Sequence, residues 1–227
     1  MSSIDLIEIA AAVAALLVAI IGHEIMHGWV AYKFGDATAK RAGRLSVNPI
    51  IHIDLFGSII VPAMTYFLPM LLGASSGFLF GWAKPVPVNI RTVIDNGGYN
   101  AAMQVSLAGI VYNFILAAVA ASVLLGMGEP TRESGLMEIV AYVFVIKLLL
   151  INVVLGVFNL LPIPQFDGAH FLMYLSMKLR IHAVAEFFYR AEQRGYGMII
   201  VIIVLVTPIK DYVLIWPVQQ VLSLLLN

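Results

Sequence analysis

The chain of 227 residues contains no cysteine and little charge, with Asp, Glu, Lys and Arg making up 11 % of its residues. Without thiols it can form neither a disulfide nor a thiolate metal site, so any bound metal must take nitrogen or oxygen ligands. A soluble domain usually carries about 25 % charged residues. The formal net charge is zero, so the basic excess of nucleic-acid-binding proteins is missing and we predict no nucleic-acid partner.

Apolar residues make up 61 % of the chain and are gathered in blocks of a length suited to crossing a lipid bilayer. The blocks comprise residues 4–34, 101–125 and 137–161, and an interrupted pair at 196–206 and 212–226. No Lys or Arg precedes Lys33, whereas a signal peptide begins with basic residues. We therefore expect the first block to be retained as a membrane span.

These blocks predict an all-α polytopic membrane protein, a bundle of about four to six transmembrane helices. We expect a single membrane-embedded domain over residues 1–227, with a core at 4–175 and C-terminal helices at 176–227. The apolar stretch 53–80 contains two prolines and three glycines, which predicts a broken, re-entrant path or a double crossing. The protein would be a multi-pass component of a membrane, and we favour a prokaryotic cell membrane.

Two further segments predict small extended or β elements near the active site. The alternating sequence GRLSVN at 43–48 is typical of a strand, and residues 77–90 favour an extended path. Within the latter, Pro85 and Pro87 direct their missing N–H groups to one edge, so that Val86 and Val88 present N–H groups to the other. This pattern is compatible with an edge that binds substrate and equally with a stiffened loop.

Basic residues predict the topology, because they concentrate on the cytoplasmic side of membrane proteins. They cluster after the first block and at 178–194, whereas the loop at 126–136 is mostly acidic. We expect residues 35–52, 81–100 and 178–194 to face the cytoplasm and 126–136 to face outwards. The active site would then lie towards the cytoplasmic side.

The sequence HEIMH at 23–27 places ionisable groups at the end of a membrane-length block, where they are costly and usually functional. His23 and His27 share one helix face, a turn apart, and can reach one ion. Glu24 cannot easily join the same tetrahedron, but it can take a proton from a water on zinc. The motif therefore predicts Zn²⁺ as cofactor and Glu24 as a general base.

Two histidines make a poor zinc site, so a third ligand is needed. Asp167 is the leading candidate, because the sequence PIPQFDG ends a span on the same predicted side as His23 and His27, and its prolines stop the helix. Gly168 permits a turn that other residues resist. The competing acidic and histidine side chains are Glu186, Glu192 and His170, which fit an ordinary surface or interface better.

The chain resembles the site-2 protease family of intramembrane zinc metalloproteases. The resemblance rests on HEIMH in a membrane helix, AGIVYN at 108–113 in the next core span, and NLLPIPQFDG at 159–168, in the family's order and spacing. It implies His23, His27 and Asp167 as zinc ligands, Glu24 as general base, and a transmembrane protein as substrate. The chain has Ile110 where the family usually has proline.

The resemblance also implies that Asn113 and Asn159 line the site, while asparagines in membrane helices often only bond neighbouring helices. We assign that second role to Asn152, which shares a helix face with Asn159. Two other functions stay open: a transporter that uses the same ligands as a transit site, and a zinc-binding pseudoprotease that holds membrane partners. The oligomeric state is not predicted.

Overall fold

The computed structural model describes residues 3–61, 64, 83–131 and 133–227. Helices dominate the described residues, and none of them forms a β-strand. The α-helices are α1 (Ser3–Lys33), α2 (Thr38–Arg41), α4 (Ile90–Met127), α5 (Leu136–Leu160), α6 (Asp167–Lys178), α7 (His182–Gln193), α8 (Tyr196–Val206) and α9 (Trp216–Leu226). Short helices of other types are η1 (Pro49–His52), η2 (Leu55–Ile60) and η3 (Asp211–Ile215).

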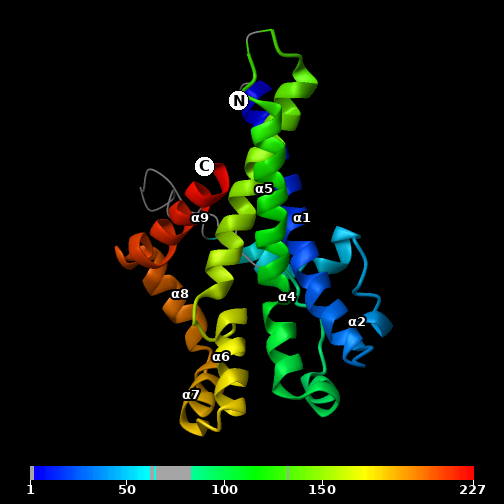
Figure 1. Cartoon of the computed structure of the whole chain (residues 1–227), viewed down its shortest axis with the longest axis vertical. Coiled ribbons are helices and arrows are strands. Elements are labelled where there is room, and N and C mark those ends of the chain that lie inside the picture. Colours follow the sequence, from blue (N-terminus) through cyan, green and yellow to red (C-terminus); the bar gives the residue numbers. More distant parts are fainter. Residues whose placement is uncertain (1–2, 62–63, 65–82, 132) are drawn as a thin grey trace.

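A central bundle of α1, α4 and α5 carries the fold, and all three helices pack against one another (Figure 1). Small residues line their contacts: Ala11, Ala15 and Ala19 recur every four residues on α1 and are buried. Lipid supplies no hydrophobic force between helices, so such residues stabilise the bundle by letting backbones approach closely. The outer helix faces instead expose large apolar side chains, as expected of a surface in contact with lipid tails.

Three of the described helices are long and apolar enough to span a membrane: α1, α4 and α5. The pair formed by α8 and residues 211–226 passes the same test only as a broken span, with a bend of 93° at its centre. The described residues therefore contain three candidate spans, or four if the bent pair counts as one. The predicted re-entrant path of 53–80 falls largely on residues 62–63 and 65–80, which lie outside the described residues.

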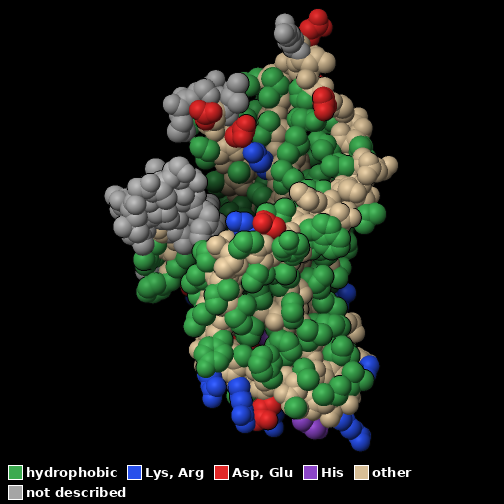
Figure 2. Space-filling view, turned by 90° about the vertical axis from the view of Figure 1, so that its left-hand side faces the viewer, with side chains coloured by type: hydrophobic (Ala, Val, Ile, Leu, Met, Phe, Trp, Pro, Cys, Tyr) green, Lys and Arg blue, Asp and Glu red, His purple; other side chains and the backbone are tan. Residues whose placement is uncertain are grey.

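The two ends of the bundle differ in charge. The loop after α1, the start of α4 and the α6–α7 hairpin lie together at the end opposite the N-terminus (Figure 1). On the face shown in Figure 2, most Lys and Arg side chains gather at that same end, below a broad apolar surface. The three basic segments of the sequence thus share one end of the molecule.

Gly98 divides α4 into a polar first part and the apolar span. Its φ of 65° and ψ of −168° interrupt the helix, and glycine adopts this conformation without a steric penalty. The predicted boundary between the polar segment and the span at residue 101 therefore lies close to a real kink.

The strand predicted at 43–48 is wrong. These residues form turns and bends, and no described segment pairs with them. Asn48 instead accepts a hydrogen bond from the backbone N–H of Ile50 and begins η1, while Arg44 is buried. Alternation of apolar and polar residues was therefore not sufficient, because a strand also needs a partner for its backbone groups.

Candidate metal centre

His23 and His27 lie on one face of α1, as their spacing predicts, and their Nε2 atoms are 3.1 Å apart. Both lie close to α4: the ring of His23 packs against Gly109 of that helix, and His27 lies beside Val105. His23 is 7 % exposed, so its imidazole is almost fully withdrawn from solvent. A buried polar side chain needs partners, and each ring has one on its other nitrogen.

Those partners fix the tautomers of both rings. Nδ1 of His23 lies 2.6 Å from Oδ1 of Asn113, and Nδ1 of His27 lies 2.7 Å from the carbonyl oxygen of Val105. Both oxygens can only accept, so each Nδ1 carries a proton, and a ring that is neutral presents its lone pair at Nε2. This arrangement, in which the second nitrogen of a histidine is held by an oxygen, is the usual support of a metal ligand.

Asp167 reaches the histidines of α1 from a different helix. It is the first residue of α6, directly after a non-helical stretch at 161–166. Its Oδ2 lies 3.1 Å from Nε2 of His23 and 3.3 Å from Nε2 of His27. The sequence motif therefore delivers the carboxylate from an interrupted helix, as expected.

The glycine after Asp167 acts differently from our expectation. Gly168 is helical, and the positive φ of 80° falls on Gln165 instead. A Cβ atom at Gly168 would lie 2.2 Å from the carbonyl oxygen of Leu160, so glycine is needed for close approach of the backbone. The predicted turn at Gly168 is therefore wrong, and glycine is needed there for a close contact with the end of α5.

The three atoms fit a zinc ion. Nε2 of His23, Nε2 of His27 and Oδ2 of Asp167 lie within 4.8 Å of one another, and Oδ2 is buried without a hydrogen bond. Three lone pairs facing one space repel each other unless a cation lies between them. Ligands about 2.0–2.1 Å from a tetrahedral zinc are roughly 3.3 Å apart, which is close to the spacing found here.

Glu24 faces the same region but takes no part in this triangle. Its Oε2 accepts a hydrogen bond of 2.7 Å from the backbone N–H of Val86. Val86 itself is 7 % exposed and packs near Gly28 of α1. The predicted edge therefore lies beside the site, but the N–H of Val86 is already donated to Glu24.

The segment Lys84–Asn89, which we call the strap, has no regular secondary structure and contacts α1. Three backbone N–H groups of the strap donate hydrogen bonds: that of Lys84 to the carbonyl of His52, that of Val86 to Glu24, and that of Asn89 to the buried carboxylate of Asp36. The two prolines have no N–H. Val88 is left as the strap residue whose N–H has no hydrogen bond to the described residues.

The asparagines have different environments. Asn113 is fully buried and donates from Nδ2 to Oδ1 of Asn152, at 2.8 Å, so that a chain of amides leads from His23 to α5. Asn152 thus bonds α5 to α4, as predicted, and its partner Asn113 is the residue that contacts His23. Asn159 donates to the carbonyl of Leu155, and no hydrogen bond joins it to the histidines, Glu24 or Asp167.

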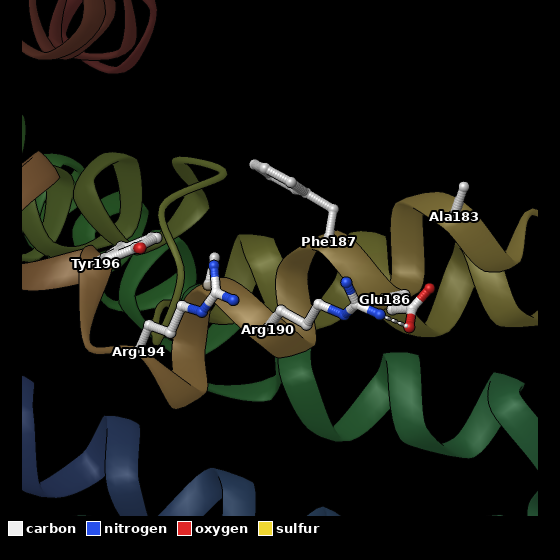
Figure 3. A pocket seen from close by; sticks show the side chains of 7 residues that line it. Ala183, Glu186, Phe187, Arg190, Arg194 and Tyr196 are labelled. Atoms are coloured by element: carbon white, nitrogen blue, oxygen red, sulfur yellow. Dashed lines mark hydrogen bonds and ion pairs between the residues drawn. The ribbon is translucent and has the colours of Figure 1, made fainter.

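The alternative ligands lie elsewhere. His170 pairs with Glu192 at 3.3 Å, and this hydrogen bond lowers the pKa of the Glu192 carboxyl. Glu186 pairs with Arg190 in an open hollow on α7 and the start of α8, where Arg194 lies 6.0 Å from the ring centre of Tyr196 (Figure 3). His23, His27 and Asp167 do not line this hollow, so it is separate from the metal centre.

Gly109 gives a direct test of the packing around His23. A Cβ atom there would lie 2.4–2.5 Å from three ring atoms of His23. We expect Gly109→Ala to displace the imidazole and weaken zinc binding by about 10-fold or more, because support of a ligand typically matters by that factor. Zinc affinity is measured by competition with a chelator of known strength.

Gly126→Ala is the matched control, since Gly126 also lies in α4 but has open space around its Cβ position. Its zinc affinity should equal that of the unchanged protein. Equal affinity in the Gly109→Ala protein would show that the ring is not confined as described.

Comparison with known proteins agrees with this site. The model of Peptidase family M50 matches residues 11–205. The chain is 37 % identical over 211 residues to "Putative zinc metalloprotease YwhC" of Bacillus subtilis, covering 90 % of this chain and 84 % of that protein. It is 26 % identical over 197 residues to "Putative zinc metalloprotease Rip2" of Mycolicibacterium smegmatis, covering 86 % and 66 % respectively. No solved structure matches the chain.

The spans and the site together define an integral membrane protein with a buried cluster of two histidines and a carboxylate. The chain belongs to peptidase family M50, the site-2 protease family, and is a zinc metalloprotease.

Proposed function

We propose that this protease cleaves peptide bonds within or near transmembrane segments of membrane proteins, and that His23, His27 and Asp167 hold its zinc. The convergence of these three ligand atoms beside Glu24 carries the proposal. The whole chain, residues 1–227, would act as one catalytic unit. A transporter would not need a carboxylate base next to its ligands, and family membership also favours hydrolysis.

Zinc, when bound, acidifies water and polarises a carbonyl, so that peptide hydrolysis becomes possible near neutral pH. Glu24 accepts the proton of the attacking water at its carboxylate and later gives it to the leaving nitrogen. Asn113 holds the Nδ1 proton of His23 and thereby keeps Nε2 directed to the centre. For Asn159 we propose a contact with substrate backbone, because it borders the non-helical stretch at 161–166.

The experiment that tests this function uses purified protein in bilayers with a panel of single-span peptides, and mass spectrometry to locate the cuts. We expect cuts inside or at the border of the span, favoured where Gly, Asn or Pro weakens the substrate helix. Cuts confined to soluble tails would overturn the assignment of substrate class. Zinc binding without any cleavage would favour a pseudoprotease.

A helical substrate hides its carbonyls in hydrogen bonds, so an extended partner helps to expose them. We propose that the strap provides this edge through Val86 and Val88. The N–H of Val86 is held by Glu24, whereas the N–H of Val88 has no acceptor among the residues that the structure describes. The hydrogen bond between Val86 and Glu24, which is adjacent to His23 in the sequence, supports placing this edge beside the metal centre.

Removing this donor should weaken substrate binding. Val88→Pro is expected to cost about 1 kcal/mol, seen as a severalfold higher KM, while zinc content stays unchanged. Val88→Ala keeps the N–H and removes a similar amount of packing, so it is the control. Equal KM values in the two variants would show that the side chain of Val88, not its N–H, explains any effect.

The topology is also open to direct measurement. We propose that the basic end of the bundle faces the cytoplasm. The absence of cysteine allows single thiols at Thr131, in the loop before α5, and at Tyr189, an exposed residue of α7. An impermeant thiol reagent added outside intact cells should label the first and spare the second. The reverse labelling pattern would contradict this orientation.

A further inference from the structure

Arg44 is a buried cation whose role the metal centre does not by itself explain. It lies in the loop between α2 and η1 and is 7 % exposed. One nitrogen, Nη2, donates to the carbonyl oxygen of Lys84 at 2.6 Å and lies 3.4 Å from that of Pro85. A buried arginine is costly, so these contacts to the strap are expected to serve a purpose.

The geometry connects Arg44 to Glu24 through one peptide unit. The carbonyl of Pro85 and the N–H of Val86 belong to the same peptide bond, and the structure contains no cis peptide bond among the described residues. In a trans peptide the two groups point in opposite directions. Arg44 therefore approaches the carbonyl end of this unit while Glu24 accepts from its N–H end, at 2.7 Å.

This arrangement fixes where the Glu24 carboxylate lies. The neighbouring residues of the strap cannot hold that peptide themselves, because Pro85 and Pro87 have no N–H to donate. The other backbone hydrogen bonds of the strap lie at its two ends, where Lys84 donates to His52 and Asn89 donates to Asp36. Among the described residues, Arg44 is thus the side chain that contacts the carbonyl oxygens of the strap next to Val86. A positive guanidinium at the carbonyl also polarises the peptide and strengthens its N–H as a donor.

We propose that Arg44 is a positioning residue of the protease: through the Pro85–Val86 peptide it holds the Glu24 carboxylate in the place from which it accepts a proton. This inference rests on the proposed role of Glu24 as general base. It assigns a catalytic consequence to a residue that touches neither the metal ligands nor, in our proposal, the substrate. A displacement of a catalytic group by about 1 Å is enough to lower a catalytic rate by about 100-fold.

The experiment compares Arg44→Ala with Arg44→Lys and with Arg41→Ala, which changes an exposed arginine at the end of α2. We expect Arg44→Ala to lower kcat by about 10- to 100-fold with little change in KM and with zinc retained. Arg44→Lys keeps one cationic donor and should recover part of the rate. Arg41→Ala should match the unchanged protein. Full zinc content also shows that each variant is folded around its metal centre.

A second readout does not depend on turnover. A peptide hydroxamate chelates an active-site metal and places its acidic proton on a neighbouring carboxylate, so its affinity reports the position of Glu24. We expect roughly tenfold weaker hydroxamate binding in both Arg44→Ala and Glu24→Gln, and no further weakening when the two changes are combined.

The outcomes separate this inference from the proposed function. A normal kcat in Arg44→Ala, beside an inactive Glu24→Gln protein, would overturn the role of Arg44 and leave Glu24 as the base. Loss of zinc in Arg44→Ala would show that Arg44 only supports the fold and would overturn the proposal as well. A normal rate in Glu24→Gln would instead reject the proposed base itself.

Discussion

Replacing Glu24 by glutamine is expected to lower peptide cleavage by at least about 100-fold while the zinc stays bound, because an amide cannot accept the proton of the attacking water. Glutamine keeps an oxygen that can accept the hydrogen bond from the N–H of Val86, so the strap should keep its place. The rate is measured on a single-span peptide, and zinc is measured by elemental analysis of the same sample.

Glu129→Gln removes the same charge from an exposed loop at the other end of the bundle and serves as the control. It should cleave at the rate of the unchanged protein. If Glu24→Gln also cleaved at that rate, another group would have to be the base, and the position of Glu24 beside the strap would need a different explanation.

The second large effect concerns the metal. We expect the protein with His23→Ala and His27→Ala to lose nearly all of its zinc, because only Oδ2 of Asp167 would remain of the three converging ligand atoms. Elemental analysis should find less than about a tenth of the zinc of the unchanged protein, and cleavage should fall to background.

The matched control replaces two other histidines, His170 and His182, which lie on α6 and α7 away from the ligand cluster. That double variant should retain its zinc. Zinc retained at the original level after loss of His23 and His27 would place the metal elsewhere in the protein.

Much of the site could be predicted because it depends on local spacing. The turn between His23 and His27 puts two imidazoles on one face of any helix, and the prolines before Asp167 interrupt the helix wherever they occur. Apolar length likewise predicted α1 and α5 to within a residue or two. Such features are consequences of backbone geometry and do not require knowledge of distant partners.

The features that escaped prediction depend on contacts between distant residues. The hydrogen bond between Glu24 and Val86 joins residues 62 positions apart, and that between Asn113 and Asn152 joins residues 39 apart. Gly109 lies in the motif AGIVYN, yet the motif does not show that the missing side chain makes room for the ring of His23. Only the packing of α4 against α1 and α5, and of the strap against α1, reveals these roles.

The proline alternation at residues 85 and 87 predicted only part of what the strap does. It predicted that Val86 and Val88 present their N–H groups to one edge, but it could not indicate that Val86 donates to a side chain of the same chain. Because that acceptor is Glu24, the strap is tied to the proposed base before any substrate arrives. Whether substrate also pairs with the strap remains a prediction that the Val88→Pro variant tests.

The central claim is that one zinc, held by His23, His27 and Asp167, is required for cleavage of membrane-embedded peptides. The most direct test removes the metal from purified protein with a chelator and then returns zinc in known amounts. Cleavage of a single-span peptide should vanish and then rise linearly to a plateau at about one zinc per chain. Cleavage that persists in fully metal-free protein, or that zinc fails to restore while the fold is intact, would contradict the account.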